Sequence, residues 1–408
     1  MEAFALANLP PTLAARDEAL DIRIQELRGD RGQAAAHAYI LKLYRDHPRP
    51  HVQALYASDL GETAQAEAVA VALQAAKAGS WRALNVLGWA LAQGKVVARD
   101  LPRAGDLVRR AANAGDPAAM FTMGEFFQST QPVKAEYWYD LASYHGLSRG
   151  LYLLGQQYDA GQSGGKPDHL RACQLYLKAS IRHSDEAYTH LKELADHGDA
   201  AGSFYRDRFL IIFGAAGANL QSQVYTAAVN HVAAQAGDDP QVLTELGLFY
   251  WTAFRAGYFD APKAKEYFQK AAQLGGLDAQ ADLAWMKAEG IGEPKDPAGA
   301  LAAWKQLAAK NNAEALSILG YYRYWGSLDR VGWEKNTTLT YYYSKRAAEA
   351  GSAYGAWYAG WCLGDGIGTP RDYAQAAVLV NEAISSGFVI GYPRMRRRLD
   401  SYLAFVEP

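Results

Sequence analysis

The chain has 408 residues, and its 41 Lys and Arg nearly balance its 43 Asp and Glu, which gives a formal net charge of −2. This balance excludes a global basic field of the kind that recruits a nucleic-acid backbone or an anionic membrane surface. The hydrophobic fraction of 50% and the charged fraction of 21% exclude the composition of a disordered chain and allow a large core.

Two further features of the sequence concern its compartment. The only cysteines, Cys173 and Cys362, are too few and too far apart to form a disulfide framework. No stretch reaches ~18 apolar residues, and the first residues lack a basic segment followed by an apolar run. The sequence therefore predicts a soluble protein with no integral membrane segment, cytoplasmic as it stands and periplasmic if a signal peptide has been removed.

Residues 1–79 are predicted to form an N-terminal helical cap with degenerate repeats. Apolar residues recur at helical spacing through 12–30 and 32–48, without the glycines that mark the chain further on. An end segment of this type seals the exposed face of a repeat array.

From residue 80 onward the chain repeats itself with a period of about 36 residues. The stretches 80–115 and 352–387 share Leu-Gly or Ala-Gly near the ninth position, a turn that contains glycine, an Asp, and a closing helical pattern that ends in Gly. Apolar residues at spacings of three and four on both sides of the turn predict two helices per unit, helix A and helix B. Seven units align: 80–115, 116–146, 147–183, 240–275, 276–312, 313–351 and 352–387.

Two sets of glycines mark these units. The first set closes helix B and fits the left-handed position just past a helix end. Its members are Gly115, Gly146, Gly275, Gly351 and Gly387. The second set lies inside helix A, where each Gly costs about 0.5–1 kcal/mol relative to Ala, so we expect helix B to approach closely there. Its members are Gly88, Gly124, Gly155, Gly247, Gly320 and Gly360.

The repeated pattern is A-x-x-x-L-G, then G-x-G-I or G-x-V-V, then D-x-x-x-A, then a Lys or Arg with Ala-Ala-x-x-Gly. In this combination it resembles the Sel1-like repeat (SLR), a relative of the tetratricopeptide repeat, over roughly residues 82–183 and 240–387. The resemblance implies an all-α fold, a right-handed superhelical solenoid of antiparallel helix pairs whose A helices line a concave face. It also implies protein–protein adaptor work and no reaction.

The repeat pattern divides the rest of the chain into segments. Residues 80–183 hold three repeats and residues 240–387 hold four, whereas residues 184–239 lose the periodicity. This middle segment is interpreted as degenerate repeats with a loop around residues 214–219, and the sequence leaves open whether it is a hinge. Residues 388–408 are predicted to form a C-terminal capping helix.

The fold does not dictate the residue type at the position that follows the helix-A glycine, so this position is a candidate for contacts with a partner protein. Along the array it holds Trp89, Glu125, Gln156, Leu248, Trp285, Tyr321 and Trp361. Trp and Tyr dominate binding hot spots, which favours a binding surface, whereas the alternative is that these rings pack as core between repeats. One turn further, Glu289, Trp325 and Asp365 form a mixed strip that suits a basic partner or, alternatively, is a solvated face. The predicted partner-binding residues are Trp89, Glu125, Gln156, Trp285, Glu289, Tyr321, Trp325, Trp361 and Asp365.

Catalytic and metal motifs find little support in the sequence. The turns GDGIGTPRD and GQSGGKPD do not fit nucleotide loops, because no parallel-sheet pattern surrounds them and Pro167 stands where Ser or Thr is needed. His183, His190 and His197 recur every seven residues, a spacing of about 10 Å on a helix, which is too long for sharing a zinc ion. The sequence therefore predicts no enzyme, no cofactor and no metal site, with both cysteines as buried, inert thiols.

Together these patterns predict an interaction scaffold that binds a partner protein on its concave face and is a monomer on its own. From the uses of similar proteins, the sharpest hypothesis is a bacterial immunity protein that neutralises a secreted type VI toxin. The alternatives are a regulatory or envelope-assembly adaptor, and a glycan- or peptidoglycan-binding module that stacks sugars on Trp and Tyr. A hydrolase with an unrecognised site is disfavoured, because repeats of this kind supply no enclosed pocket.

Overall fold

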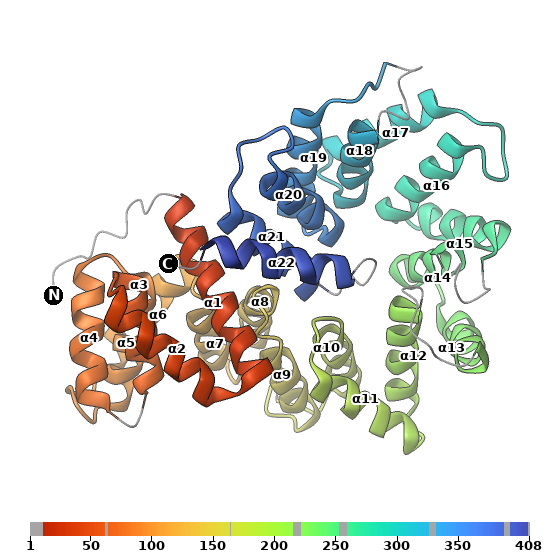
Figure 1. Ribbon diagram of the computed structural model, residues 1–408. Coiled ribbons are helices and arrows are strands. Elements are labelled where there is room, and N and C mark those ends of the chain that lie inside the picture. Colours follow the sequence, from red (N-terminus) through yellow and green to blue (C-terminus); the bar gives the residue numbers. More distant parts are fainter. Residues whose placement is uncertain are drawn as a thin grey trace. The chain divides into compact units, whose positions relative to one another are not determined.

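A computed structural model gives the fold of the chain (Figure 1). The residues that it describes are 11–61, 64–163, 165–214, 222–252, 259–325, 332–386 and 392–406. All the regular elements in these ranges are α-helices, 22 in number, which confirms the predicted all-α class. The helices form two compact units. The first unit is Met1–Asp168 with Tyr373–Val378 and Asp400–Pro408, and the second is His169–Asp372 with Leu379–Leu399.

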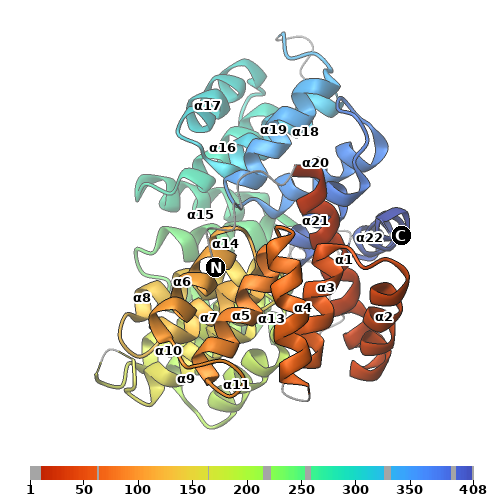
Figure 2. The same cartoon turned by 90° about the vertical axis from the view of Figure 1, so that its left-hand side faces the viewer.

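The first unit contains nine complete helices in its described part. They are α1 (Pro11–Arg31), α2 (Gln33–Asp46), α3 (Pro50–Leu60), α4 (Gln65–Lys77), α5 (Trp81–Gln93), α6 (Leu101–Asn113), α7 (Pro117–Phe127), α8 (Pro132–Tyr144) and α9 (Arg149–Asp159). The helical patterns at 12–30 and 32–48 correspond to α1 and α2. Figure 2 shows α1 to α9 in colours that run from red through orange to yellow.

The second unit continues with helices of similar length. They are α10 (His169–Ile181), α11 (Asp185–Asp196), α12 (Ala200–Gly214), α13 (Ser222–Gln235), α14 (Pro240–Thr252), α15 (Ala261–Gln273), α16 (Leu277–Glu289), α17 (Pro297–Ala309), α18 (Ala313–Trp325), α19 (Thr337–Glu349) and α20 (Ala353–Asp365). The last two helices, α21 (Tyr373–Ser385) and α22 (Tyr392–Val406), are divided between the units. Most of the predicted loop at 214–219 lies outside the described residues.

Helices pair in chain order within each unit. Helix α5 packs on α6 and α7 on α8 in the first unit, and α14 packs on α15, α16 on α17 and α18 on α19 in the second. Each pair also contacts the following one through α6 and α7, α15 and α16, or α17 and α18. The chain is therefore an α-helical solenoid of antiparallel helix pairs, as the repeat pattern predicts.

In three of the repeats the recurring Asp is the N-cap of helix B. The carboxylates of Asp100, Asp260 and Asp296 accept hydrogen bonds from backbone N–H groups three residues on, at 3.1, 3.0 and 2.8 Å. Each thereby satisfies one of the N–H groups that the first turn of a helix leaves without a partner. The closing glycines Gly115, Gly146, Gly275 and Gly351 have φ between 87° and 98°, which confirms the predicted left-handed stop, while Gly387 lies outside the described residues.

The glycines inside helix A mark close approaches to helix B. A Cβ atom on Gly88 would lie 2.7 Å from Cγ2 of Val108 in α6, and one on Gly247 would lie 2.5 Å from the Phe268 ring in α15. Gly124 likewise faces the Tyr139 ring of α8, and Gly320 faces Ser344 of α19. The predicted contacts are confirmed at these four glycines. The other two, Gly155 and Gly360, are buried.

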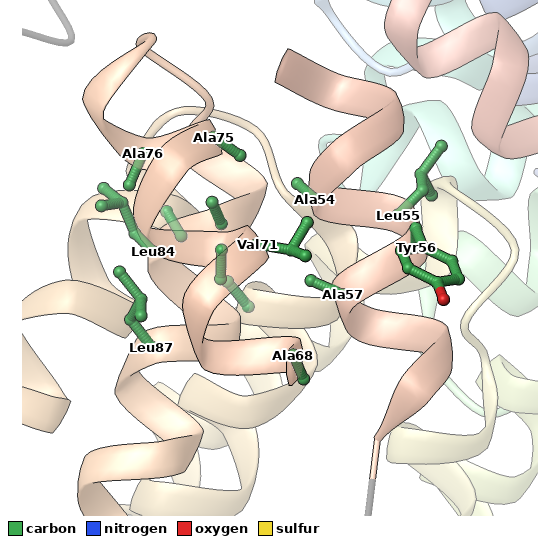
Figure 3. Packing of buried hydrophobic residues seen from close by; sticks show 14 of the residues in the cluster. Ala54, Leu55, Tyr56, Ala57, Ala68, Val71, Ala75, Ala76, Leu84 and Leu87 are labelled. Atoms are coloured by element: carbon green, nitrogen blue, oxygen red, sulfur yellow. The ribbon is translucent and has the colours of Figure 1, made fainter. Parts of the chain in front are cut away.

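The core of the first unit is built from small residues, which allow its helices to pack closely. In Figure 3, Val71 of α4 lies against Ala54 and Ala57 of α3, and Leu84 and Leu87 of α5 pack on the other side of α4. All five residues are less than 9% exposed. The N-terminal helices are therefore continuous with the core of the first recognisable repeat.

Beside this apolar core the first unit buries a group of charges. Arg82 of α5 is hydrogen-bonded to Asp21 of α1 and lies 3.7 Å from Asp116, the N-cap of α7. His51 of α3 contacts the same Asp21 carboxylate, with 2.9 Å between Nε2 and Oδ1. Burial acts to raise the pKa of Asp21, but Arg82 and His51 lower it below its ordinary value. This network connects α1, α3, α5 and α7.

Candidate functional site

The predicted partner-binding residues fall into both units. Trp89, Glu125 and Gln156 lie on the A helices α5, α7 and α9 of the first unit. Trp89 is half-buried and packs against the apolar core, whereas Glu125 and Gln156 are exposed. The other six residues all lie on A helices of the second unit, α16, α18 and α20.

The second unit brings its predicted aromatic residues together in a chain of ring contacts. The Trp285 ring of α16 lies 5.8 Å from that of Tyr321 in α18, which in turn lies 6.3 Å from Trp325. Tyr324 connects Trp325 to Trp361 of α20, with centroid distances of 5.0 and 5.1 Å. These separations are typical of favourable aromatic pairs.

The rings in this chain are neither fully buried nor free of the core. Trp325 is 56% exposed, and Trp285, Tyr321 and Trp361 are half-buried. Trp285 and Tyr321 also pack against the apolar cluster of α16, α17 and α18. Trp285 and Tyr321 therefore contact the core with one part and leave another part on the surface, whereas Trp325 is mostly exposed.

The two predicted acidic residues of this strip already have partners. Glu289 accepts a hydrogen bond of 2.6 Å from the Tyr322 hydroxyl, and its other oxygen lies 3.7 Å from Lys295 Nζ. Asp365 accepts hydrogen bonds from Trp361 Nε1 and from Arg398, the latter at 2.7 Å. Burial acts to raise the pKa of Asp365, but these two donors lower it below its ordinary value. Both carboxylates thus hold neighbouring side chains in position.

Two other carboxyl groups on these A helices were not anticipated from the sequence. Asp282 of α16 is only 6% exposed, and burial, together with Glu314 and Asp278, raises its pKa well above the ordinary value. Burial and Asp278 raise the pKa of Glu314 in α18 to about 7. No basic side chain in the described part of the chain lowers the pKa of either group. Among the described residues, neither group therefore has a cationic partner that would stabilise its ionised form.

Helical spacing places these carboxyl groups on the same face as the rings. Asp282 precedes Trp285 by three residues, and Glu314 precedes Tyr321 by seven, which are one and two helical turns. On α20, the Tyr354 and Tyr358 rings are 4.6 Å apart, and the Tyr358 and Trp361 rings are 5.6 Å apart. This set of residues, in which Asp282 and Tyr358 are buried, is called the aromatic–acidic face below. It consists of Asp282, Trp285, Glu289, Glu314, Tyr321, Trp325, Tyr354, Tyr358, Trp361 and Asp365.

Comparison with known families identifies the repeat. The Sel1 repeat model matches seven segments, which begin and end within two residues of the units found in the sequence. They are 81–116, 117–147, 148–182, 242–276, 277–312, 313–352 and 353–388. The matches cover more than half of the chain.

The chain belongs to the Sel1 repeat family. Repeats of this type and of the tetratricopeptide type are generally protein–protein interaction scaffolds, and proteins built from them are typically not enzymes. No curated protein matches the chain. Among the described residues of this Sel1 repeat protein, no helix combines the length and the apolar character needed to cross a membrane.

Three solved structures resemble the Sel1 repeat chain at low sequence identity. The protective antigen c5321 of uropathogenic Escherichia coli, which displays an SLR fold, is 19% identical, with 90% of this chain and 93% of the antigen covered and a TM-score of 0.32. A Sel1 repeat protein from Oxalobacter formigenes is 20% identical, with coverage of 81% and 92% and a TM-score of 0.31. Yeast Tom70 is 10% identical, with coverage of 95% and 90% and a TM-score of 0.38.

The three regularly spaced histidines of the Sel1 repeat chain have separate surroundings. His183 Nε2 lies 2.6 Å from the Ile384 carbonyl oxygen, and His197 Nδ1 lies 2.6 Å from the Glu193 carbonyl oxygen. The His190 ring packs edge-on against Tyr176, with 4.8 Å between centroids. The structure therefore gives each ring its own contacts.

The carboxyl groups of the aromatic–acidic face should make the stability of the Sel1 repeat chain depend on pH. The pKa of Glu314 is raised from 4.5 to about 7 in the folded chain, so the folded state binds its proton more tightly than the unfolded state between these values. Stability should then fall as pH rises through this window. We expect Glu314→Gln to raise the free energy of unfolding by about 1–2 kcal/mol at pH 8, and to change it little at pH 4.

Urea unfolding followed by circular dichroism at several pH values measures this effect. Glu349→Gln is the matched control, because Glu349 is an exposed glutamate of α19, and this change should have little effect at any pH. A Glu314→Gln chain that is less stable than wild type at pH 8 would contradict the expected sign.

Proposed function

We propose that this chain binds a partner protein through the aromatic–acidic face of its second unit, and that the bound surface of the partner presents basic side chains. The observation that supports the proposal is the combination of contiguous, partly exposed rings with two carboxyl groups that lack a basic partner among the described residues. The face lies on the A helices, which the family resemblance predicts to line a concave surface.

The rings supply the apolar part of such an interface. Trp and Tyr bury large areas on binding and lose little conformational freedom, so they are common among residues that dominate binding energy. Trp325, at 56% exposed, has the largest free area on this face. The Trp325 ring contacts the rings of Tyr321 and Tyr324, with 6.3 and 5.0 Å between centroids. We therefore expect Trp325 to contribute most among the rings.

The carboxyl groups supply the charge preference. A lysine or arginine side chain of a partner that approaches Asp282 and Glu314 would stabilise their ionised forms and lower their pKa values. Aromatic neighbours favour the same ligand, because a cation over a ring is attracted to it. Binding should therefore release protons near pH 7 and weaken as salt is added.

The test begins with capture of proteins from a lysate of the native organism on the immobilised full chain. The variant combines Trp285→Ala, Tyr321→Ala and Trp325→Ala, and Tyr342→Ala serves as the matched control, because Tyr342 is an exposed aromatic residue of the B helix α19. Circular dichroism establishes that all chains are folded. The affinity of the captured protein, once purified, should fall at least tenfold for the triple variant and stay within about twofold for the control.

The partner's charge is tested separately with an Asp282→Asn and Glu314→Gln double variant, which should bind more weakly and with a smaller salt dependence. A captured protein whose affinity is the same for wild type and for the folded triple variant would place binding elsewhere on the chain. Equal loss of binding for the triple variant and for Tyr342→Ala would also count against the face.

The same experiment separates the narrower hypotheses. Neutralisation of a secreted type VI toxin rests on the family resemblance, and it requires the captured protein to be a toxin that wild type inhibits and the triple variant does not. A regulatory or assembly protein in its place supports the adaptor alternative. Retention of the purified chain on peptidoglycan or another glycan, lost with Trp325→Ala, would replace the protein-binding proposal by the glycan-binding one.

A further inference from the structure

The second unit brings three metal-ligating side chains together at the start of α10, away from the aromatic–acidic face. His169 and Cys173 lie four residues apart on α10 and so share one face of that helix. Asp199 lies directly before α12 and reaches the same point, with 3.0 Å between its Oδ1 and His169 Nε2. The Cys173 Sγ atom lies 3.6 Å from the same nitrogen. All three donor atoms are within 4.8 Å of one another.

These distances fit the edges of a tetrahedral zinc site. Bonds of about 2.0–2.1 Å to nitrogen and about 2.3 Å to sulfur place the two atoms roughly 3.6 Å apart across a tetrahedron, and the nitrogen–oxygen edge is about 3.3 Å. His169 Nε2 carries at most one proton, and both Sγ and Oδ1 lie next to it. A metal ion bonded to all three atoms accounts for their convergence.

Burial and hydrogen bonding at the cluster also fit a metal ion. Cys173 is fully buried, while the side chains of His169 and Asp199 are 40% and 33% exposed, so two of the three side chains reach the solvent. The Gly202 N–H donates a hydrogen bond of 2.6 Å to Asp199 Oδ1, which orients this carboxylate. Three protein ligands would leave a fourth position for water.

We propose that His169, Cys173 and Asp199 bind a divalent transition-metal ion, with Zn²⁺ as the preferred one. A thiolate with an imidazole favours zinc over the harder ions magnesium and calcium. Binding would replace the thiol proton of Cys173, which is released to solvent, and a water molecule would complete the tetrahedron. The site joins α10 to the N-terminus of α12, so it would fix the start of the middle segment. This inference does not rest on the proposed function.

The test is a titration of the reduced, metal-free full chain with Co²⁺, whose optical spectrum reports its ligands. Wild type should develop a thiolate-to-cobalt charge-transfer band together with the intense visible bands of tetrahedral cobalt, and one equivalent of Zn²⁺ should remove both. Cys173→Ser should abolish the charge-transfer band. His169→Ala and Asp199→Asn should each weaken Co²⁺ binding at least tenfold. Asparagine at position 199 also keeps the capacity to cap α12.

The second cysteine provides the matched control. Cys362 is buried in α20, where burial raises the pKa of its thiol to about 12, and Cys362→Ser should leave the cobalt spectrum unchanged. A wild-type chain without the charge-transfer band overturns the proposal whether or not any variant folds. So does a band that survives in Cys173→Ser, or one that is lost in Cys362→Ser.

Discussion

Replacing Arg82 by methionine should lower the free energy of unfolding of the first unit by about 3–5 kcal/mol. Arg82 has a side chain only 13% exposed and is the cation between Asp21 and Asp116, which are 7% and 0% exposed. Methionine fills much of the same volume but leaves two buried carboxylates without that cation. Removing one member of a buried charge network costs this much because the remaining charges are no longer compensated.

A double variant separates the lost charge from lost packing. Adding Asp21→Asn to Arg82→Met removes one of the two carboxylates that lose this cation and should recover part of the loss. Urea unfolding of wild type, the two single variants and the double variant measures the coupling energy. Arg109→Met is the matched control, because Arg109 pairs with Asp106 on the surface of α6 and its loss should cost less than about 1 kcal/mol. Equal effects at Arg82 and Arg109 would contradict the buried-network argument.

The pH dependence of the Arg82→Met variant follows from the same contacts. In wild type the pKa of Asp21 is below its ordinary value, so its contribution to stability is present above pH 4 and is lost as the pH falls through the lower folded-state pKa. Without Arg82, burial should raise the pKa of Asp21, and it should raise further the pKa of Asp116, which burial already holds above its ordinary value in wild type. The deficit of the variant should then be smaller at pH 5 than at pH 7.

Features repeated along the chain could be predicted from the sequence. The closing glycines have φ near 90°, and the glycines of helix A face helix B. Both positions require a residue without a side chain, so both can be recognised in the sequence as a recurring glycine. In three of the repeats the recurring Asp is the N-cap of helix B, a role that depends only on the first turn of the same helix. These marks were enough to give the seven repeats and the all-α fold.

Features that occur once could not be predicted in the same way. Asp21 and Arg82 are 61 residues apart, and Asp199 lies 30 residues from His169, so no spacing along the chain indicates that they meet. The regular interval of His183, His190 and His197 drew attention instead, although these rings have separate contacts. The aromatic register was visible because it repeats, whereas Asp282 and Glu314 precede it at different distances. Helical spacing from Trp285 and Tyr321 was the signal that could have found them.

Trp304 packs behind the aromatic–acidic face, against α16 and α18. We expect the stability of the second unit to be most sensitive to truncation at this position. The Trp304 ring is fully buried in α17, donates a hydrogen bond of 3.0 Å from Nε1 to the Ala281 carbonyl of α16, and stacks on Tyr322 of α18 at 5.2 Å. Tyr322 in turn holds Glu289. We expect Trp304→Ala to lower the free energy of unfolding by about 3–5 kcal/mol, because it removes this packing and leaves a cavity.

Two further variants separate the contributions to this effect. Trp304→Phe keeps most of the apolar contact and loses the hydrogen bond, so it should cost about 1–2 kcal/mol. Trp325→Ala removes the same type of side chain from a position that is 56% exposed, and it should change stability by less than about 1 kcal/mol. Urea unfolding of the three variants measures these differences. Equal losses for Trp304→Ala and Trp325→Ala would mean that Trp325 also belongs to the core. If Trp325→Ala is as stable as wild type, the ring is not needed for folding, which agrees with a role in binding.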